Sequence, residues 1–165
     1  MVIIGLDLSL TASGMVALGV CGGIISAKTF GYGLKRTSST ERKLKRLLHI
    51  ASEVCTFVQE VLSDPSISLD DISVVIEGYA YSARGSQNDL AELQGAVKTQ
   101  LYLMFKIVSE PIPSTRARKL VLGRGRVTKD QILEELAQKG HVFTDHNQAD
   151  AFVVAYAKRL MLEQS

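Results

Sequence analysis

The chain has 165 residues, of which 46% are hydrophobic and 22% charged, with a net charge of +2 and two cysteines. This length and apolar content suit one ordinary domain with its own core, and they exclude a disordered chain or a disulfide scaffold. We therefore expect a single domain over residues 1–165. Because no apolar run approaches the roughly 20 residues that span a bilayer, we expect a cytoplasmic protein with no membrane partner.

Three strands are predicted first. The apolar segments Met1–Leu8, Gly14–Val20 and Ile24–Phe30 are separated by small residues and by a turn at Cys21–Gly23, which favours a β-meander. Ser38 and Glu41 then have the spacing of a helix capping box. The helix that follows has apolar residues every three or four positions: Leu44, Leu47, Leu48, Ala51, Val54, Cys55, Val58 and Leu62.

Strands and helices alternate in the second half. Ile72–Gly78 reads as a short buried strand and residues 88–108 as a helix, in which Leu90, Leu93, Val97, Leu101, Met104 and Phe105 have helical spacing. Residues 110–119 predict an edge strand leading into a helical turn. Thr128 and Gln131 form a second capping-box pattern, before a helix that ends at Gly140. A last helix is expected over His146–Glu163, and the order βββ-α-β-α-β-α-α predicts an α/β domain with a mixed sheet.

Acids stand at the ends of these elements. Asp7 ends the first strand, Glu77 ends the fourth, and Asp150 lies one turn inside the last helix. Neighbouring parallel strands would bring the first two together, and three clustered carboxylates need a cation to neutralise them. An oxygen-rich acidic site suits Mg²⁺ or Mn²⁺. The alternative is that each acid is separately solvated or salt-bridged.

Four segments, taken in order, carry a family resemblance: "IIGLDLSLTASG", "VVIEGY", "LGRGRVTKDQI" and "NQADAFVVAYA". Together they span almost the whole chain and resemble the RuvC-type Holliday junction resolvases of the RNase H-like superfamily. The compact length looks most like the phage-encoded members, for which the location would be the host cytoplasm. The resemblance implies a five-stranded mixed sheet, a three-strand meander followed by β-α units, flanked by helices.

The resemblance also implies a metal site. Asp7, Glu77 and Asp150 would bind two catalytic Mg²⁺ ions, with Mn²⁺ as a substitute, and the family's remaining ligand falls on Asn147. That ligand is usually Asp or His in the family, so Asp145 and His146 are kept as alternatives beside Asn147. We interpret the small residues after Asp7 as giving a phosphate backbone room to approach.

A basic segment lies before and within the penultimate helix. Residues 116–129 contain six Lys or Arg and no acid. By resemblance, Arg118 and the catalytic Lys129 would lie near the scissile phosphate, where cations stabilise developing negative charge. Lys119, Arg124 and Arg126 would extend this track along nucleic acid. The alternative is ordinary surface charge, which explains many such clusters.

The loop after Glu77 supplies further candidates for nucleic-acid binding. Tyr79 and Tyr81 flank Ala80, the position at which the family has an aromatic residue, and they would stack on bases at an opened junction or pack against the protein. Arg84 is a candidate phosphate contact. The helix over residues 88–108 would pack in the core or also pair two copies of the chain, since a two-fold junction favours a homodimer.

The resulting hypothesis is a metal-dependent crossover junction endodeoxyribonuclease. It would cut four-way DNA junctions by symmetric paired nicks in recombination, repair or phage DNA processing, leaving 5′-phosphate and 3′-hydroxyl ends. The alternatives are a broader nuclease for branched DNA or RNA on the same fold, and a catalytically silent nucleic-acid-binding module. A phosphotransferase of the actin and sugar-kinase type is excluded because that fold is repeated twice in a longer chain.

Overall fold

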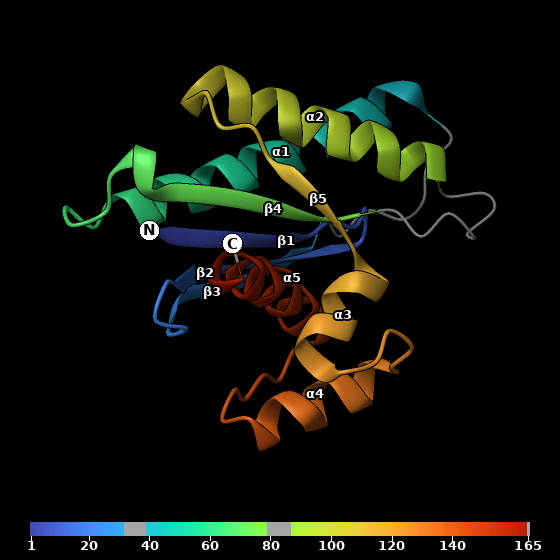
Figure 1. The fold of residues 1–165 in the computed structure, drawn as a ribbon. Helices are drawn as coiled ribbons and strands as arrows, with labels where there is room; N and C mark the ends of the chain where they lie inside the picture. The colour runs from blue at the N-terminus through green and yellow to red at the C-terminus, as the bar shows by residue number, and fades with distance from the viewer. Residues whose placement is uncertain (32–38, 79–86, 165) are drawn as a thin grey trace.

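A five-stranded mixed β-sheet forms the centre of the computed structural model, which describes residues 1–31, 39–78 and 87–164 (Figure 1). The strand order is β3-β2-β1-β4-β5, with β1 to β3 antiparallel and with β4 and β5 parallel to β1. The strands are β1 (Val2–Asp7), β2 (Ala12–Gly19), β3 (Ile24–Gly31), β4 (Ile72–Gly78) and β5 (Glu110–Pro113). The predicted meander, mixed sheet and edge strand are confirmed.

Helices cover both faces of the sheet. Figure 1 shows α1 and α2 on one face and α5 on the other, with α3 and α4 packed outside α5. The helices are α1 (Thr40–Leu62), α2 (Gln87–Phe105), α3 (Ser114–Leu122), α4 (Lys129–Gln138) and α5 (His146–Glu163), and a 3₁₀ turn, η1 (Leu69–Asp71), precedes β4. The segment predicted as a helical turn is thus the complete helix α3, which ends at Gly123 in the left-handed conformation that glycine favours (φ 78°).

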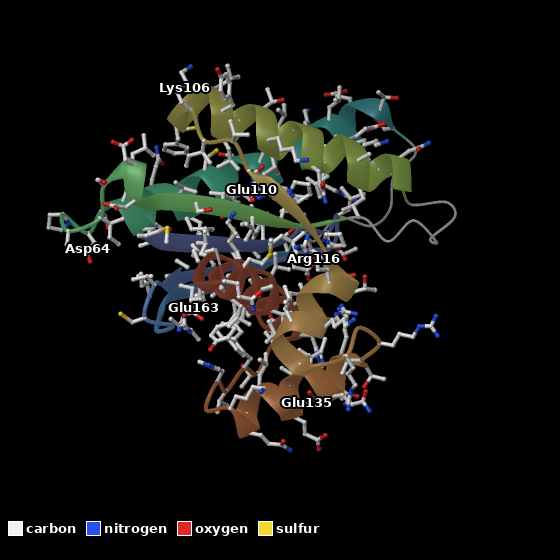
Figure 2. All side chains as sticks on the ribbon, in the orientation of Figure 1. Asp64, Lys106, Glu110, Arg116, Glu135 and Glu163 are labelled. Atoms are coloured by element: carbon white, nitrogen blue, oxygen red, sulfur yellow. The ribbon has the colours of Figure 1, made fainter. Side chains whose placement is uncertain are left out.

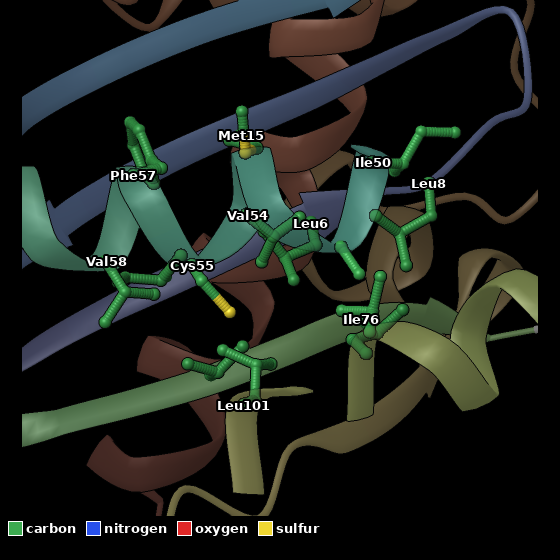
Figure 3. Close-up of a cluster of buried hydrophobic side chains, with 14 of the residues drawn as sticks. Leu6, Leu8, Met15, Ile50, Val54, Cys55, Phe57, Val58, Ile76 and Leu101 are labelled. Carbon is green, nitrogen blue, oxygen red and sulfur yellow. The ribbon is translucent and has the colours of Figure 1, made fainter. Parts of the chain in front are cut away.

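Strand alternation divides the core into two parts. In β1, Ile4 and Leu6 point toward α1 and α2, whereas Ile3 points toward α5. Figure 3 shows Leu6 and Ile76 packed with side chains of α1 on the first of these faces. Because side chains alternate between faces, Asp7 shares the α5 face with Ile3.

Three predictions about the helices need correction. Leu44, Leu48 and Met104 are about half exposed, although their spacing predicted burial. In α1 the buried stripe also includes Ile50 and Phe57 and leaves Leu44 and Leu48 on its flank. In α2 the core-facing side continues past Leu101 to the partly buried Phe105, and Met104 lies on the solvent side.

Of the two predicted capping boxes, one is present at the start of its helix. Thr128 and Gln131 form the reciprocal capping box, so α4 begins where its sequence predicts. Helix α1 instead begins after Ser39, whose side chain makes no capping hydrogen bond, and Ser38 lies outside the described residues.

Two glycines let α5 lie directly on the sheet. A Cβ at Gly5 would stand 2.2 Å from the Ala151 carbonyl oxygen, and one at Gly14 would stand 2.0 Å from the Asn147 carbonyl oxygen. The interpretation that the small residues after Asp7 admit a phosphate backbone is therefore wrong for Gly14, because the main chain of α5 fills that space. Within residues 1–31, 39–78 and 87–164, no helix has the length and apolar character needed to cross a membrane.

Replacing Gly5 by alanine is expected to destabilise the protein by about 2–3 kcal/mol, because the added methyl meets main-chain atoms that have little freedom to move. Urea unfolding measures the change in the free energy of unfolding. Gly23→Ala is the control: a Cβ there meets nothing within 4 Å, and the expected change is below about 0.5 kcal/mol. Equal stability of the two variants would contradict close packing of α5 on β1.

Candidate functional site

Asp7 and Glu77 lie at the carboxyl ends of two adjacent parallel strands. The pairing of β1 with β4 ends at Leu6 and Ile76, so both acids follow the last paired residues. Glu77 shares the α5 face with Val75, as Asp7 does with Ile3. The register of β1 and β4 therefore places Asp7 and Glu77 side by side, as the sequence predicts.

The carboxyl group of Asp7 is strongly perturbed. Burial raises its pKa to about 8, together with the negative charge of Glu77, a hydrogen bond with Glu77 and the charge of Asp150, against the opposing effect of Lys129. Without a further cation, the raised pKa favours the protonated form of Asp7. A metal ion bound there would displace this proton, because carboxylates bind metals in the deprotonated form.

Asp150 joins this pair from helix α5. Its side chain is 5% exposed, and its Oδ1 lies 3.2 Å from Arg118 Nη2, which is also 3.6 Å from Glu77 Oε1. Lys129 Nζ lies 3.7 Å from Asp150 Oδ2. Arg118 therefore bridges Glu77 and Asp150, and Lys129, at the start of α4, contacts the other carboxylate oxygen of Asp150. We name Asp7, Glu77 and Asp150 the acid cluster.

The two cations are brought to the acid cluster by local structure in the basic segment. Arg118 lies in α3, which follows directly on β5, and α3 packs against α5. Lys129 is the first residue of α4, at a position set by the Thr128 capping box. Its side chain is 59% exposed, so it contacts Asp150 while remaining open to a ligand from solvent.

The residues before Asp150 have other partners. Asp145 caps α5 and accepts hydrogen bonds from the Asn147 main-chain nitrogen at 2.7 Å and side-chain Nδ2 at 3.0 Å. Burial opposes ionisation of Asp145, but hydrogen bonds from Asn147 and Gln148 outweigh it and lower its pKa. His146 Nε2 lies 3.5 Å from Asp130. Asp145 is thus engaged in capping α5, and Asn147 directs its amide nitrogen to the same cap. Among the described residues, His146 Nδ1 is buried and has no hydrogen-bond partner.

The remaining predicted nucleic-acid contacts fall into two groups. Lys119, Arg124 and Arg126 are exposed, and Arg124 forms an ion pair with Glu135 of α4. Figure 2 shows Arg116 where β5 passes into α3, and Glu135 farther away on α4. Lys119 lies in α3, whereas Arg124 and Arg126 lie in the connection between α3 and α4. Tyr79, Tyr81 and Arg84 lie outside the described residues.

Comparison with known proteins gives matches by structure alone. No family model and no curated protein sequence matches the chain. The Thermus thermophilus RuvC structure matches with a TM-score of 0.73 at 16% identity, covering 99% of this chain and 96% of that one. T. thermophilus RuvC in complex with Holliday junction substrate also matches with a TM-score of 0.73, at 15% identity, covering 100% of this chain and 96% of that one. The chain has a RuvC-like fold. The α/β architecture expected from the sequence is thereby confirmed.

Within this RuvC-like fold, the donor atoms at the sheet edge suit a divalent cation. Among the described residues, no group of three His, Cys, Asp or Glu is arranged to hold a metal ion, and two members of the acid cluster pair with Arg118 instead. The chemistry of the cluster nevertheless fits Mg²⁺ or Mn²⁺. It offers carboxylate oxygens, and the charges of Glu77 and Asp150 add to burial in raising the pKa of Asp7, so a cation bound there would offset their mutual repulsion.

One contact at the site was not expected from the sequence. Gln94 of α2 is 1% exposed, and its Nε2 donates a hydrogen bond to the Glu77 main-chain oxygen at 2.8 Å. The sequence feature that could have indicated this contact is a glutamine between Leu93 and Val97, two apolar residues with helical spacing. Buried amides are normally hydrogen-bonded, so such a residue marks a specific polar contact.

The metal-free protein is expected to lose stability as pH rises from about 4 to 8. Asp7 has a folded-state pKa near 8 against an ordinary value of 3.8, so the folded state binds the extra proton in this window. The free energy of unfolding then falls by up to about 1.4 kcal/mol per pH unit. Thermal unfolding in a chelator should show this slope in the wild type and a much flatter one in Asp7→Asn.

Asp70→Asn is the matched control for this measurement, because Asp70 is exposed in the turn before β4. It should keep the wild-type slope. The same slope in all three proteins would contradict a buried, protonated Asp7.

Proposed function

We propose that the chain is a metal-dependent, structure-selective endonuclease that resolves four-way DNA junctions by symmetric paired nicks. In this proposal residues 1–165 form one RuvC-like nuclease domain. The observation that carries it is the acid cluster at the strand ends of a RuvC-like fold, with Arg118 and Lys129 in contact with it. Three acids from separate elements gathered in a largely buried place are costly for stability alone, which favours a functional reason for them.

The acid cluster would hold the divalent cations, with Asn147 as the neutral oxygen donor one turn before Asp150. Two bound Mg²⁺ or Mn²⁺ ions supply Lewis-acid stabilisation of a phosphodiester and a nucleophilic water at neutral pH. Asp7 would bind a cation in its deprotonated form. Glu77 and Asp150 would bind it with the carboxylate oxygens that contact Arg118 in the metal-free protein.

Arg118 and Lys129 are placed to act on the phosphate. Released from Asp150, both side chains lie beside the acid cluster, where a cation stabilises the charge that develops on the cleaved phosphate. Lys119, Arg124 and Arg126 would contact neighbouring phosphates and position the backbone. Cleavage is proposed to leave 5′-phosphate and 3′-hydroxyl ends. Tyr79, Tyr81 and Arg84 are proposed to contact the opened bases and backbone.

Pairing of two nicks requires two active sites, and we propose that α2 supplies the homodimer contact. Its carboxyl-terminal half exposes Tyr102 and Leu103, which are 52% and 63% exposed. With Val108, which is 77% exposed, they line an open apolar groove of about 350 Å³. Exposed apolar surface of this kind marks an interaction site, and a two-fold substrate favours a second copy of the same chain.

Cleavage of end-labelled synthetic four-way junctions with Mg²⁺ or Mn²⁺ tests the proposal. Wild type should place symmetric nicks on opposing strands, whereas Asp7→Asn and Glu77→Gln should lose at least about 10³-fold in rate, as removal of a catalytic charge commonly does. Asp70→Asn, an exposed acid on the same chain, should cut like wild type.

The other substrates decide between functions. Linear duplex, three-way and flap DNA should be cut far more slowly than the four-way junction. Equal cutting of every branched substrate would replace this proposal with the broader nuclease, and junction binding without cleavage under either metal would leave a binding module.

A further inference from the structure

Gln94 occupies an unusual place for an amide side chain. It lies on the buried side of α2 beside Leu93 and Val97, which belong to the apolar core between α1, α2 and the sheet. Its Nε2 donates to the main-chain oxygen of Glu77 at 2.8 Å. The Glu77 side chain faces α5, so the residue is held from both faces of the sheet: its main chain by α2 and its carboxylate by Arg118 of α3.

Few main-chain N–H groups of the neighbouring strands face the end of β4. Pairing with β1 stops at Ile76, and the Asp7 main chain pairs with β2. On the other side, Ile76 and Gly78 lie opposite Pro111 and Pro113, and proline has no N–H to donate. The side-chain amide of Gln94 therefore provides a hydrogen bond where the strand ladder ends.

An amide is a poor choice for core packing at this position. Within the part of the chain that the structure describes, Gln94 Oε1 is buried and has no hydrogen-bond partner. A buried acceptor without a partner lowers stability, and an apolar side chain of the same shape would remove that penalty. In return, the Gln94 amide donates its N–H to the main-chain oxygen of Glu77.

We propose that Gln94 is a positioning residue for the acid cluster: it fixes the main chain at Glu77 and so sets where that carboxylate meets Asp7. This inference rests on the proposed role of Glu77 in cation binding. Partners behind metal ligands commonly change metal affinity or activity by about 10- to 100-fold when removed. Gln94 would act in this way through the backbone of the ligand.

Gln94→Met tests the inference, because it keeps the length of the side chain and removes the N–H. Titration of the protein with Mn²⁺ alone, followed by calorimetry, should give a dissociation constant about 10-fold or more above wild type. The melting temperature in a chelator should change little, because loss of the unpartnered Gln94 Oε1 offsets loss of the donor to the Glu77 main-chain oxygen. Single-turnover junction cleavage should slow by a similar factor with little change in the junction concentration that half-saturates it.

Leu101→Met is the matched control, since Leu101 is a fully buried residue two turns along the same helix that takes the same replacement. It should bind Mn²⁺ like wild type. Gln94→Leu provides a second shape if the methionine variant fails to fold. Wild-type Mn²⁺ affinity in the Gln94 variants, with or without a fall in melting temperature, would overturn the inference.

Failure of the proposed function gives a different pattern. If wild type binds Mn²⁺ but cuts no DNA, the nuclease proposal fails, while the difference in Mn²⁺ affinity between wild type and Gln94→Met still decides the role of Gln94. If wild type binds no Mn²⁺, both proposals are overturned.

Discussion

The direct contact between α5 and the first two strands determines how the rest of the structure is arranged. Gly5 and Gly14 remove the side chains that would otherwise hold the helix away, and the main chain of α5 occupies the space. Helix α5 also packs against α3 and α4, so the position of these helices depends on the same contact. Through it, Asp150 is carried to the strand ends, and Arg118 and Lys129 reach the acids from the outer helices.

Electrostatics gives this arrangement its chemical character. Two unit charges about 4 Å apart interact by about 4 kcal/mol at an effective dielectric constant near 20, so three acids together repel strongly. The protein balances part of this charge with Arg118 and Lys129, and burial together with the charges of Glu77 and Asp150 raises the pKa of Asp7, which favours its uncharged form. Under the proposed function, divalent cations replace the proton and release the two basic side chains toward a phosphate.

Much of the fold follows from local sequence patterns. The bounds of β4 and α5 agree with the apolar runs that predicted them, and the Thr128 cap does set the start of α4. The acids at the ends of β1 and β4 were predictable for a similar reason, since a carboxylate closing an apolar strand is conspicuous. Arg118 and Lys129 came from the family resemblance, and the structure brings both into contact with Asp150.

Other features depend on contacts between elements distant in sequence. The burial of Leu44, Leu48 and Met104 was overestimated because spacing shows that a helix is amphipathic but not how far the neighbouring element covers it. Gly14 was assigned to a phosphate because the sequence does not show that α5 lies on it. The sequence pattern does not indicate the role of Gln94, because its partner is a main-chain atom 17 positions away.

Under the proposed function, Asp7, Glu77 and Asp150 bind divalent cations together. The most direct measurement is a crystal structure with Mn²⁺ at pH 8, using the anomalous scattering of manganese to locate the ion. We expect an anomalous peak bound by all three carboxylates, with Arg118 withdrawn from Glu77. Ordered Arg118 contacts to Glu77 and Asp150 at saturating Mn²⁺, with no manganese at the acid cluster, would contradict it.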